Sequence, residues 1–258
     1  MAQSAVPIQA KPKAAAGGKW AIAIAVALGA LLEVVDTSIV NVALTDMQNT
    51  LGATLSEVSW VVSGYAVANV IVLPLTAWLG DRFGKKRYFI FSLIGFTIAS
   101  VMCGMATTLP LLIIARVLQG LMGGGLLAKA QAILFETFPK EEQGVAQAFF
   151  GAIVIAGPAI GPTLGGYLVT NIGWRWIFFV NVPLGILAVI MCSASLKPDG
   201  ENKNTSQIDW IAILMLACGL GSLQTLLEEG NSEDWFQSRF ICLLFVSAIV
   251  SIGAFVHR

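Results

Sequence analysis

Eight long stretches of apolar residues, separated by short polar segments, dominate the chain. A helix needs roughly 17–25 apolar residues to cross the hydrocarbon core of a bilayer, and each stretch is long enough. The apolar residues run continuously rather than alternating with polar ones, which excludes the strands of an outer-membrane barrel. The pattern therefore predicts an all-α integral membrane protein. The predicted spans are Trp20–Leu44, Val58–Leu79, Tyr88–Met105, Leu109–Phe135, Val145–Thr170, Trp176–Leu196, Ile208–Leu227 and Phe240–Val256.

The polar segments divide the chain into units. Residues 1–18 are rich in Ala, Gly, Pro and Lys without periodicity, which predicts a disordered tail. Residues 19–196 hold six closely spaced spans and are expected to form one six-helix bundle. Residues 197–207 form a polar linker, and residues 208–258 hold two additional spans. Because the sequence stops directly after the eighth span, we expect a C-terminal bundle to be absent from these 258 residues.

Composition narrows the class of protein. The chain is 57% hydrophobic and only 12% charged, about half the charged share of a soluble domain. That composition excludes a soluble enzyme, and the net charge of zero gives no reason to expect a nucleic-acid partner. The four cysteines are scattered singly and the chain has one histidine, His257, so we predict no metal site and no cofactor.

Lysine and arginine residues orient the predicted spans. With the N-terminus inside, the cytoplasmic segments hold most of these residues, whereas the opposite side holds only Arg175 and Arg239. This asymmetry places both termini in the cytoplasm. The cytoplasmic set is Lys11, Lys13, Lys19, Arg82, Lys85, Lys86, Arg87, Lys140, Lys197, Lys203 and Arg258.

Ionisable residues inside predicted spans are costly and point to function. The first span contains Glu33 and Asp36, which share one helical face with Thr37 and Asn41. One interpretation is that these acids are neutral and hydrogen-bonded between helices. The functional interpretation is a carboxyl group that binds and releases a proton.

The fourth span carries two cationic residues, Arg116 and Lys129. Arginine does not lose its proton, so inside a membrane it needs an anionic partner or strong hydrogen-bond acceptors. At 1.5 Å per residue, Asp36 lies about 24 Å and Arg116 about 30 Å from the cytoplasmic ends of their helices, which predicts contact between them. Lys129 falls on the other face near the cytoplasmic end, and we favour a side chain that extends to the membrane interface.

A basic segment, Ala77–Arg87, joins the second and third spans. Asp81 and Arg82 lie among its cations, between Gly80 and Gly84. We interpret the segment as a loop with a tight turn and a specific ion-pair network.

Small residues repeat along the fifth span. Gly157, Gly161 and Gly165 are spaced by four, which gives a face on which another helix can pack closely. Pro158 and Pro162 each remove a backbone hydrogen bond and are expected to bend this helix. Packing alone explains the glycines but not both prolines.

Five segments together resemble the major facilitator superfamily, specifically its 14-span drug:proton antiporter branch (EmrB/QacA-like). The basic segment departs from the superfamily's pattern at Ala77 and Gly80. The segments are Val35–Leu44 in the first span, the basic segment Ala77–Arg87, Arg116–Gly120, Gly157–Gly166 and Trp174–Pro183.

The resemblance implies a proton-coupled exporter of amphipathic or cationic drugs that works by alternating access in the bacterial inner membrane. A periplasmic adaptor protein and an outer-membrane channel are partners of some family members. Asp36 and Arg116 are implied in proton coupling, and we add Glu33 from its position on the same face. Conformational gating is assigned to Asp81, Arg82, Gly84, Gly157, Pro158, Gly161, Pro162 and Gly165, and the substrate-cavity candidates are Asn41, Tyr65, Asn69, Gln119 and Gln131.

Two alternatives stay open. The chain could be a non-transporting truncated scaffold or sensor, or part of a proton-coupled uptake symporter. The glycine and proline pattern of the fifth span argues against uptake. The sequence contains no nucleotide-binding loop, which makes ATP-driven pumping an unfavoured mechanism.

Overall fold

The computed structural model describes residues 16–196 and 209–258, and helices account for all the regular structure in that part of the chain. The predicted tail lies outside the described residues except at its end, because α1 begins at Ala16. The predicted linker, residues 197–207, also lies outside them. The elements are α1 Ala16–Leu51, α2 Leu55–Phe83, α3 Lys85–Met105, α4 Leu109–Gly123, α5 Leu126–Thr137, α6 Lys140–Asn171, α7 Trp176–Phe179, α8 Asn181–Ser195, α9 Trp210–Glu229, η1 Trp235–Gln237 and α10 Arg239–His257.

The eight predicted spans are confirmed as apolar segments long enough to cross a membrane, so the chain is a multi-pass membrane protein. Several helices run further than their apolar stretches. α1 continues to Leu51 and α6 begins at Lys140. Polar residues can extend a helix beyond its apolar stretch because they stay hydrated there. The hydrophobic pattern therefore underestimates the length of these helices.

The fourth predicted span is confirmed as one apolar segment, but its helix is interrupted at the three consecutive glycines. α4 ends at Gly123 and α5 begins at Leu126. Between them Gly125 has φ of 72°, in the left-handed region that favours glycine. A Cβ on Gly125 would also lie only 3.0 Å from Thr76 Oγ1. The break therefore depends on a residue without a side chain.

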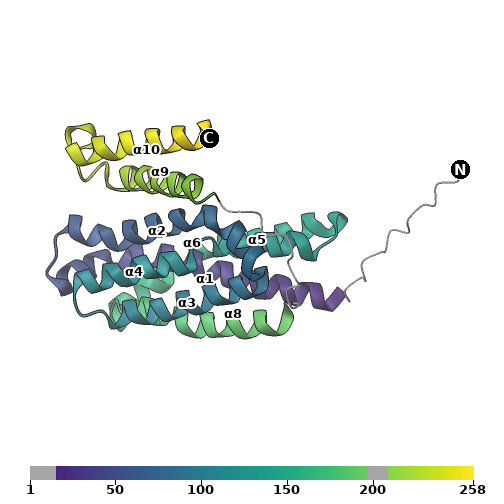
Figure 1. Cartoon of the computed structure of the whole chain (residues 1–258). Helices are drawn as coiled ribbons and strands as arrows, with labels where there is room; N and C mark the ends of the chain where they lie inside the picture. Colours follow the sequence, from purple (N-terminus) through teal and green to yellow (C-terminus); the bar gives the residue numbers. More distant parts are fainter. Residues whose placement is uncertain (1–15, 197–208) are drawn as a thin grey trace, which may run out of the picture.

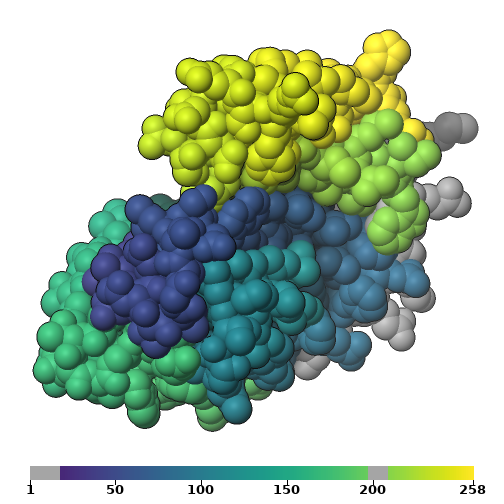
Figure 2. All heavy atoms as spheres, turned by 90° about the vertical axis from the view of Figure 1, so that its left-hand side faces the viewer, coloured from purple at the N-terminus to yellow at the C-terminus, as the bar shows by residue number. Residues whose placement is uncertain are grey.

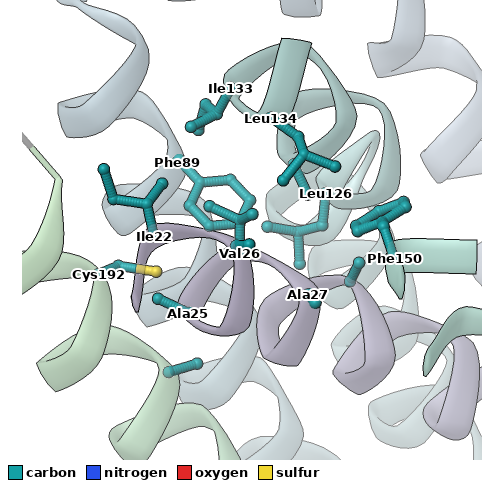
Figure 3. Packing of buried hydrophobic residues seen from close by; sticks show 14 of the residues in the cluster. Ile22, Ala25, Val26, Ala27, Phe89, Leu126, Ile133, Leu134, Phe150 and Cys192 are labelled. Carbon is teal, nitrogen blue, oxygen red and sulfur yellow. The ribbon is translucent and has the colours of Figure 1, made fainter. Parts of the chain in front are cut away.

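α1 is the central helix of the bundle and contacts α5, α6 and α8, while α2 and α3 both pack on α4 (Figure 1). One apolar cluster surrounds the first half of α1, where Val26 lies beside Phe89 and Leu126, and Phe150 lies beside Ala27 (Figure 3). A second cluster surrounds its second half and includes Ile39, Met47, Val58, Leu112 and Phe178. Glu33 and Asp36 of α1 lie between the residues that this helix gives to the two clusters.

The helices α9 and α10 form a hairpin that packs on α2 through α9 (Figure 1). Seen from the end opposite the N-terminus, the hairpin is a lobe on one side of the bundle (Figure 2). Asp209 joins the two hairpin helices by accepting hydrogen bonds from the Ala212 N–H (3.0 Å) and Arg258 Nε (2.6 Å). These hydrogen bonds, the backbone one foremost, lower the pKa of Asp209 below its ordinary value.

The glycine face of α6 packs against α1, as its spacing predicts. A Cβ on Gly157 would lie 2.7 Å from Val34 Cγ1, and one on Gly165 would lie 2.8 Å from Ile39 Cγ1. A Cβ on Gly161 would overlap Ser38 Oγ. Helix α6 continues through both prolines, whose residues are exposed on its other side.

We expect Gly161→Leu to weaken the α1–α6 contact, because a leucine side chain has no room beside Ser38. Overpacking costs about 1–3 kcal/mol, which corresponds to a fall of about 2–10 °C in the melting temperature of the purified chain in detergent. Gly166→Leu is the matched control, since a Cβ at Gly166 meets open space. Equal melting temperatures for the two variants would contradict this packing role.

Candidate functional site

Asp36 on α1 is fully buried and accepts hydrogen bonds from three side chains. Arg116 Nη1 lies 2.6 Å from Oδ2, while Gln119 Nε2 and Asn181 Nδ2 lie 3.1 and 2.7 Å from Oδ1. The ion pair predicted from helix rise is therefore confirmed. The donors come from α4 and α8, so one carboxylate joins three helices.

Arg116 is fixed in position by several contacts. Its Nε donates to the Val61 carbonyl oxygen (3.0 Å), and its Nη1 also donates to Gln119 Oε1 (2.7 Å). The guanidinium carbon lies 4.2 Å from the centroid of the Tyr65 ring. A planar cation with several donors suits this combination of hydrogen bonding and ring stacking.

A second layer of polar residues orients the donors to Asp36. Asn181 Nδ2 lies 3.1 Å from Ser100 Oγ, and that hydroxyl donates to the Phe178 carbonyl oxygen (2.9 Å). Neither Asn181 nor Ser100 is among the site residues predicted from the sequence. A signal for Asn181 was present, because an amide inside an apolar span needs a partner.

Glu33 has partners of its own. Its side chain accepts hydrogen bonds from Asn69 Nδ2 (2.6 Å) and from the backbone N–H of Leu127 (2.8 Å), and the residue is 8% exposed. Leu127 lies in the first turn of α5, where unpaired N–H groups and the helix dipole favour an anion. Glu33 thus holds the start of the second half of the interrupted span.

Lys129 does not extend to the interface, so that interpretation is wrong. The residue is only 6% exposed, and its Nζ donates to Ser92 Oγ (2.7 Å) and lies 4.1 Å from the centroid of the Tyr88 ring. The interpretation assumed one continuous helix. The break at Gly123–Gly125 changes the direction of every later side chain in the span.

Three of the five substrate-cavity candidates lie close together, and two are exposed. Tyr65 and Gln119 are buried beside Arg116, and Asn69 is bound to Glu33. Asn41 and Gln131 are exposed, and their amides bond to the Thr37 carbonyl oxygen and to Gln147. A pocket of about 490 Å³ lies between α2, α3 and α4, and none of the five lines it.

The basic segment Ala77–Arg87 is helical except at Gly84, which corrects the prediction of a loop. Gly84 has φ of 92°, so the chain reverses between α2 and α3 at a single residue. Asp81 and Arg82 lie exposed in the last turn of α2. Neighbouring cations reach other helices, since Lys85 pairs with Glu136 of α5 and Lys86 Nζ donates to the Ser193 carbonyl oxygen (3.0 Å) of α8.

The family model described as Major Facilitator Superfamily matches residues 26–257. The chain belongs to this superfamily. The D-xylose–proton symporter, whose structure is known, has the same fold, with a TM-score of 0.62 at 14% identity over 92% of this chain and 66% of the symporter. At that identity the likeness concerns the fold alone.

Curated relatives are closer in sequence. The chain is 40% identical to multidrug export protein EmrB of Escherichia coli K12 over 229 residues, which cover 89% of this chain and 45% of that protein. It is 38% identical to multidrug export protein EmrB of Haemophilus influenzae, over 95% of this chain and 48% of the relative. The chain thus spans about half the length of the curated relatives it matches.

Proposed function

We propose that the chain is the N-terminal half of a drug:proton antiporter that exports amphipathic or cationic compounds across a bacterial inner membrane. The observation that carries the proposal is the buried Asp36–Arg116 pair, held by donors from α4 and α8. The names of the relatives, multidrug export proteins, support the substrate class.

Proton uptake at Asp36 would change the forces between helices. Arginine keeps its proton, so the carboxylate is the member of the pair that can exchange one. A protonated Asp36 still accepts from Gln119 and Asn181 but loses its ionic attraction to Arg116, whose buried charge is then uncompensated. Proton binding therefore favours an arrangement in which α1 and α4 have moved relative to each other.

The movement of α1 would pass to α6 through their glycine contact. Transport in this fold needs two bundles that rock about a site between them. The side of α6 that carries Pro158 and Pro162 is exposed, and we assign it to the contact with a second bundle. In this scheme Gly157, Gly161 and Gly165 transmit the change, so they have a gating role.

The distribution of charged residues supports an orientation of the chain in the membrane and a gating role for the turn at Gly84. Both termini are proposed to lie in the cytoplasm, because lysine and arginine are concentrated on that side of the predicted spans. The turn at Gly84 with Asp81 and Arg82 lies on the same side, and we assign it to closing the cytoplasmic end in the outward-facing state. On the opposite side, a periplasmic adaptor protein and an outer-membrane channel are proposed partners.

Glu33 is proposed as a second coupling carboxyl group. Glu33→Gln removes the negative charge from the N-terminal end of α5 and replaces one acceptor by a donor that faces Asn69 or the Leu127 N–H. We expect the complete transporter with this change to export a narrower range of cations, most clearly fewer divalent ones. Resistance of cells to mono- and divalent cationic dyes measures the range, and Glu141→Gln, at an exposed position of α6, is the control. An unchanged range would remove Glu33 from the coupling scheme.

The experiment that tests the proposed function uses everted membrane vesicles with an imposed pH gradient. Vesicles holding this chain joined to a second six-helix bundle should lose part of the gradient when a cationic drug is added, whereas the 258-residue chain alone should not respond. No response from the joined protein would favour a scaffold or sensor. Drug movement in the same direction as protons would favour uptake.

A further inference from the structure

A second buried carboxylate lies outside the site described above, where the hairpin meets the bundle. Glu229, the last residue of α9, is 2% exposed and faces α2. Ser63 Oγ donates to its Oε1 (2.5 Å), and Ser59 Oγ lies 3.3 Å from the same oxygen. From the following turn, Ser232 Oγ lies 3.0 Å from Oε2 and 3.0 Å from the Glu229 carbonyl oxygen.

No positively charged side chain among the described residues pairs with this carboxylate. All its side-chain partners among the described residues are serine hydroxyls, and the ion pairs of the described residues do not include Glu229. The C-terminal end of α9 adds the negative end of a helix dipole. A buried carboxylate is costly unless a positive charge compensates it or a proton neutralises it.

We propose that Glu229 and the three serines bind one sodium ion. Six oxygen atoms come together here, namely Oε1, Oε2 and the carbonyl oxygen of Glu229 and the hydroxyls of Ser59, Ser63 and Ser232. Hard cations are bound by such sets of carboxylate, carbonyl and hydroxyl oxygens. A proton needs only one acceptor oxygen, so a set of six oxygen atoms favours a metal cation. A single carboxylate balances one positive charge, which favours sodium over a divalent cation.

An ion can reach the cluster from solvent through Ser232, which is exposed. Two further acids in the connection between α9 and α10, Glu233 and Asp234, are exposed as well and raise the local concentration of cations. This site shares no side chain with the Asp36 site, although α2 contributes to both, with Ser59 and Ser63 here and Val61 and Tyr65 there.

Sodium at this position would strengthen the attachment of the hairpin to the bundle. Apolar contacts also join α9 to the bundle, such as the approach of Gly221 to Ile71 and the edge-to-face contact of Trp210 with Trp78. Such apolar contacts hold α9 against α2, but they do not fix how far α9 is shifted along the axis of α2. An ion shared by Ser59 and Ser63 of α2 and Glu229 of α9 would define that position.

The test measures binding of radioactive sodium to the purified 258-residue chain in detergent by a scintillation proximity assay. We expect saturable binding that unlabelled sodium chloride displaces and choline chloride does not. Glu229→Gln should abolish it, Ser63→Ala should weaken it about tenfold or more, and Glu228→Gln, the exposed neighbour, should leave it unchanged. The melting temperature should rise with sodium, relative to choline, in the original chain and in Glu228→Gln.

Absence of saturable sodium binding to the original chain would overturn the proposal. So would unchanged binding in Glu229→Gln, or a loss in Glu228→Gln equal to that in Glu229→Gln. If Glu229→Gln does not fold, the Ser63→Ala variant decides, because it keeps every charge and removes one hydroxyl oxygen.

Discussion

Replacing Asp36 with asparagine in the complete transporter is expected to abolish drug-driven proton movement while drug binding stays measurable. The amide has nearly the shape of the carboxyl group but binds no proton at neutral pH. It also turns one acceptor into a donor in a position that faces Arg116, Gln119 and Asn181. Since Arg116 would be left without its counter-charge, we expect a loss of about 3–5 kcal/mol in stability.

The measurement for this variant is the drug-induced loss of a pH gradient in everted vesicles, together with equilibrium drug binding to purified protein. Asp46→Asn is the matched control, because Asp46 lies on the same helix at an exposed position. Normal gradient loss with Asp36→Asn would show that another group carries the proton.

Arg116→Lys is expected to uncouple transport although it keeps the positive charge. An ammonium group cannot donate to both the Val61 carbonyl oxygen and Asp36 while stacking on the Tyr65 ring, as the guanidinium does. Loss of one hydrogen bond to a charged group costs about 1.5–3 kcal/mol. The melting temperature and the drug-induced loss of the pH gradient should both fall.

Arg175→Lys is the control for that variant. Arg175 also donates to a backbone carbonyl oxygen, that of Ala106 (3.0 Å), and stacks on the Trp174 ring at 4.3 Å, but it has no ion pair among the described residues. If lysine serves equally well at both positions, a positive charge is all that the site requires of Arg116.

Much of the arrangement could be predicted from the sequence, because a membrane leaves few choices. Long apolar stretches are expected to form membrane-spanning helices, and a buried arginine is expected to pair with an acidic residue. The rise of the helix then placed Asp36 and Arg116 at similar depth, and the structure brings them together. The spacing of Gly157, Gly161 and Gly165 likewise predicted that another helix packs closely on this face, and the structure identifies that helix as α1.

The failures have a common physical cause, which is backbone geometry that side-chain patterns do not encode. Three consecutive glycines in the fourth span are compatible with a continuous or an interrupted helix, and only the left-handed conformation of Gly125 decides. The estimate for Lys129 assumed the continuous form and failed with it. The basic segment Ala77–Arg87 was interpreted as a loop because it is polar, yet one glycine suffices for the reversal.

The most direct test of proton exchange at Asp36 is proton release from the purified complete transporter in a weakly buffered detergent solution. Addition of a cationic drug should release protons from the original protein and from Asp46→Asn, as a pH-sensitive dye reports, and should release none from Asp36→Asn. Equal proton release by Asp36→Asn and the original protein, with drug bound to both, would contradict the account.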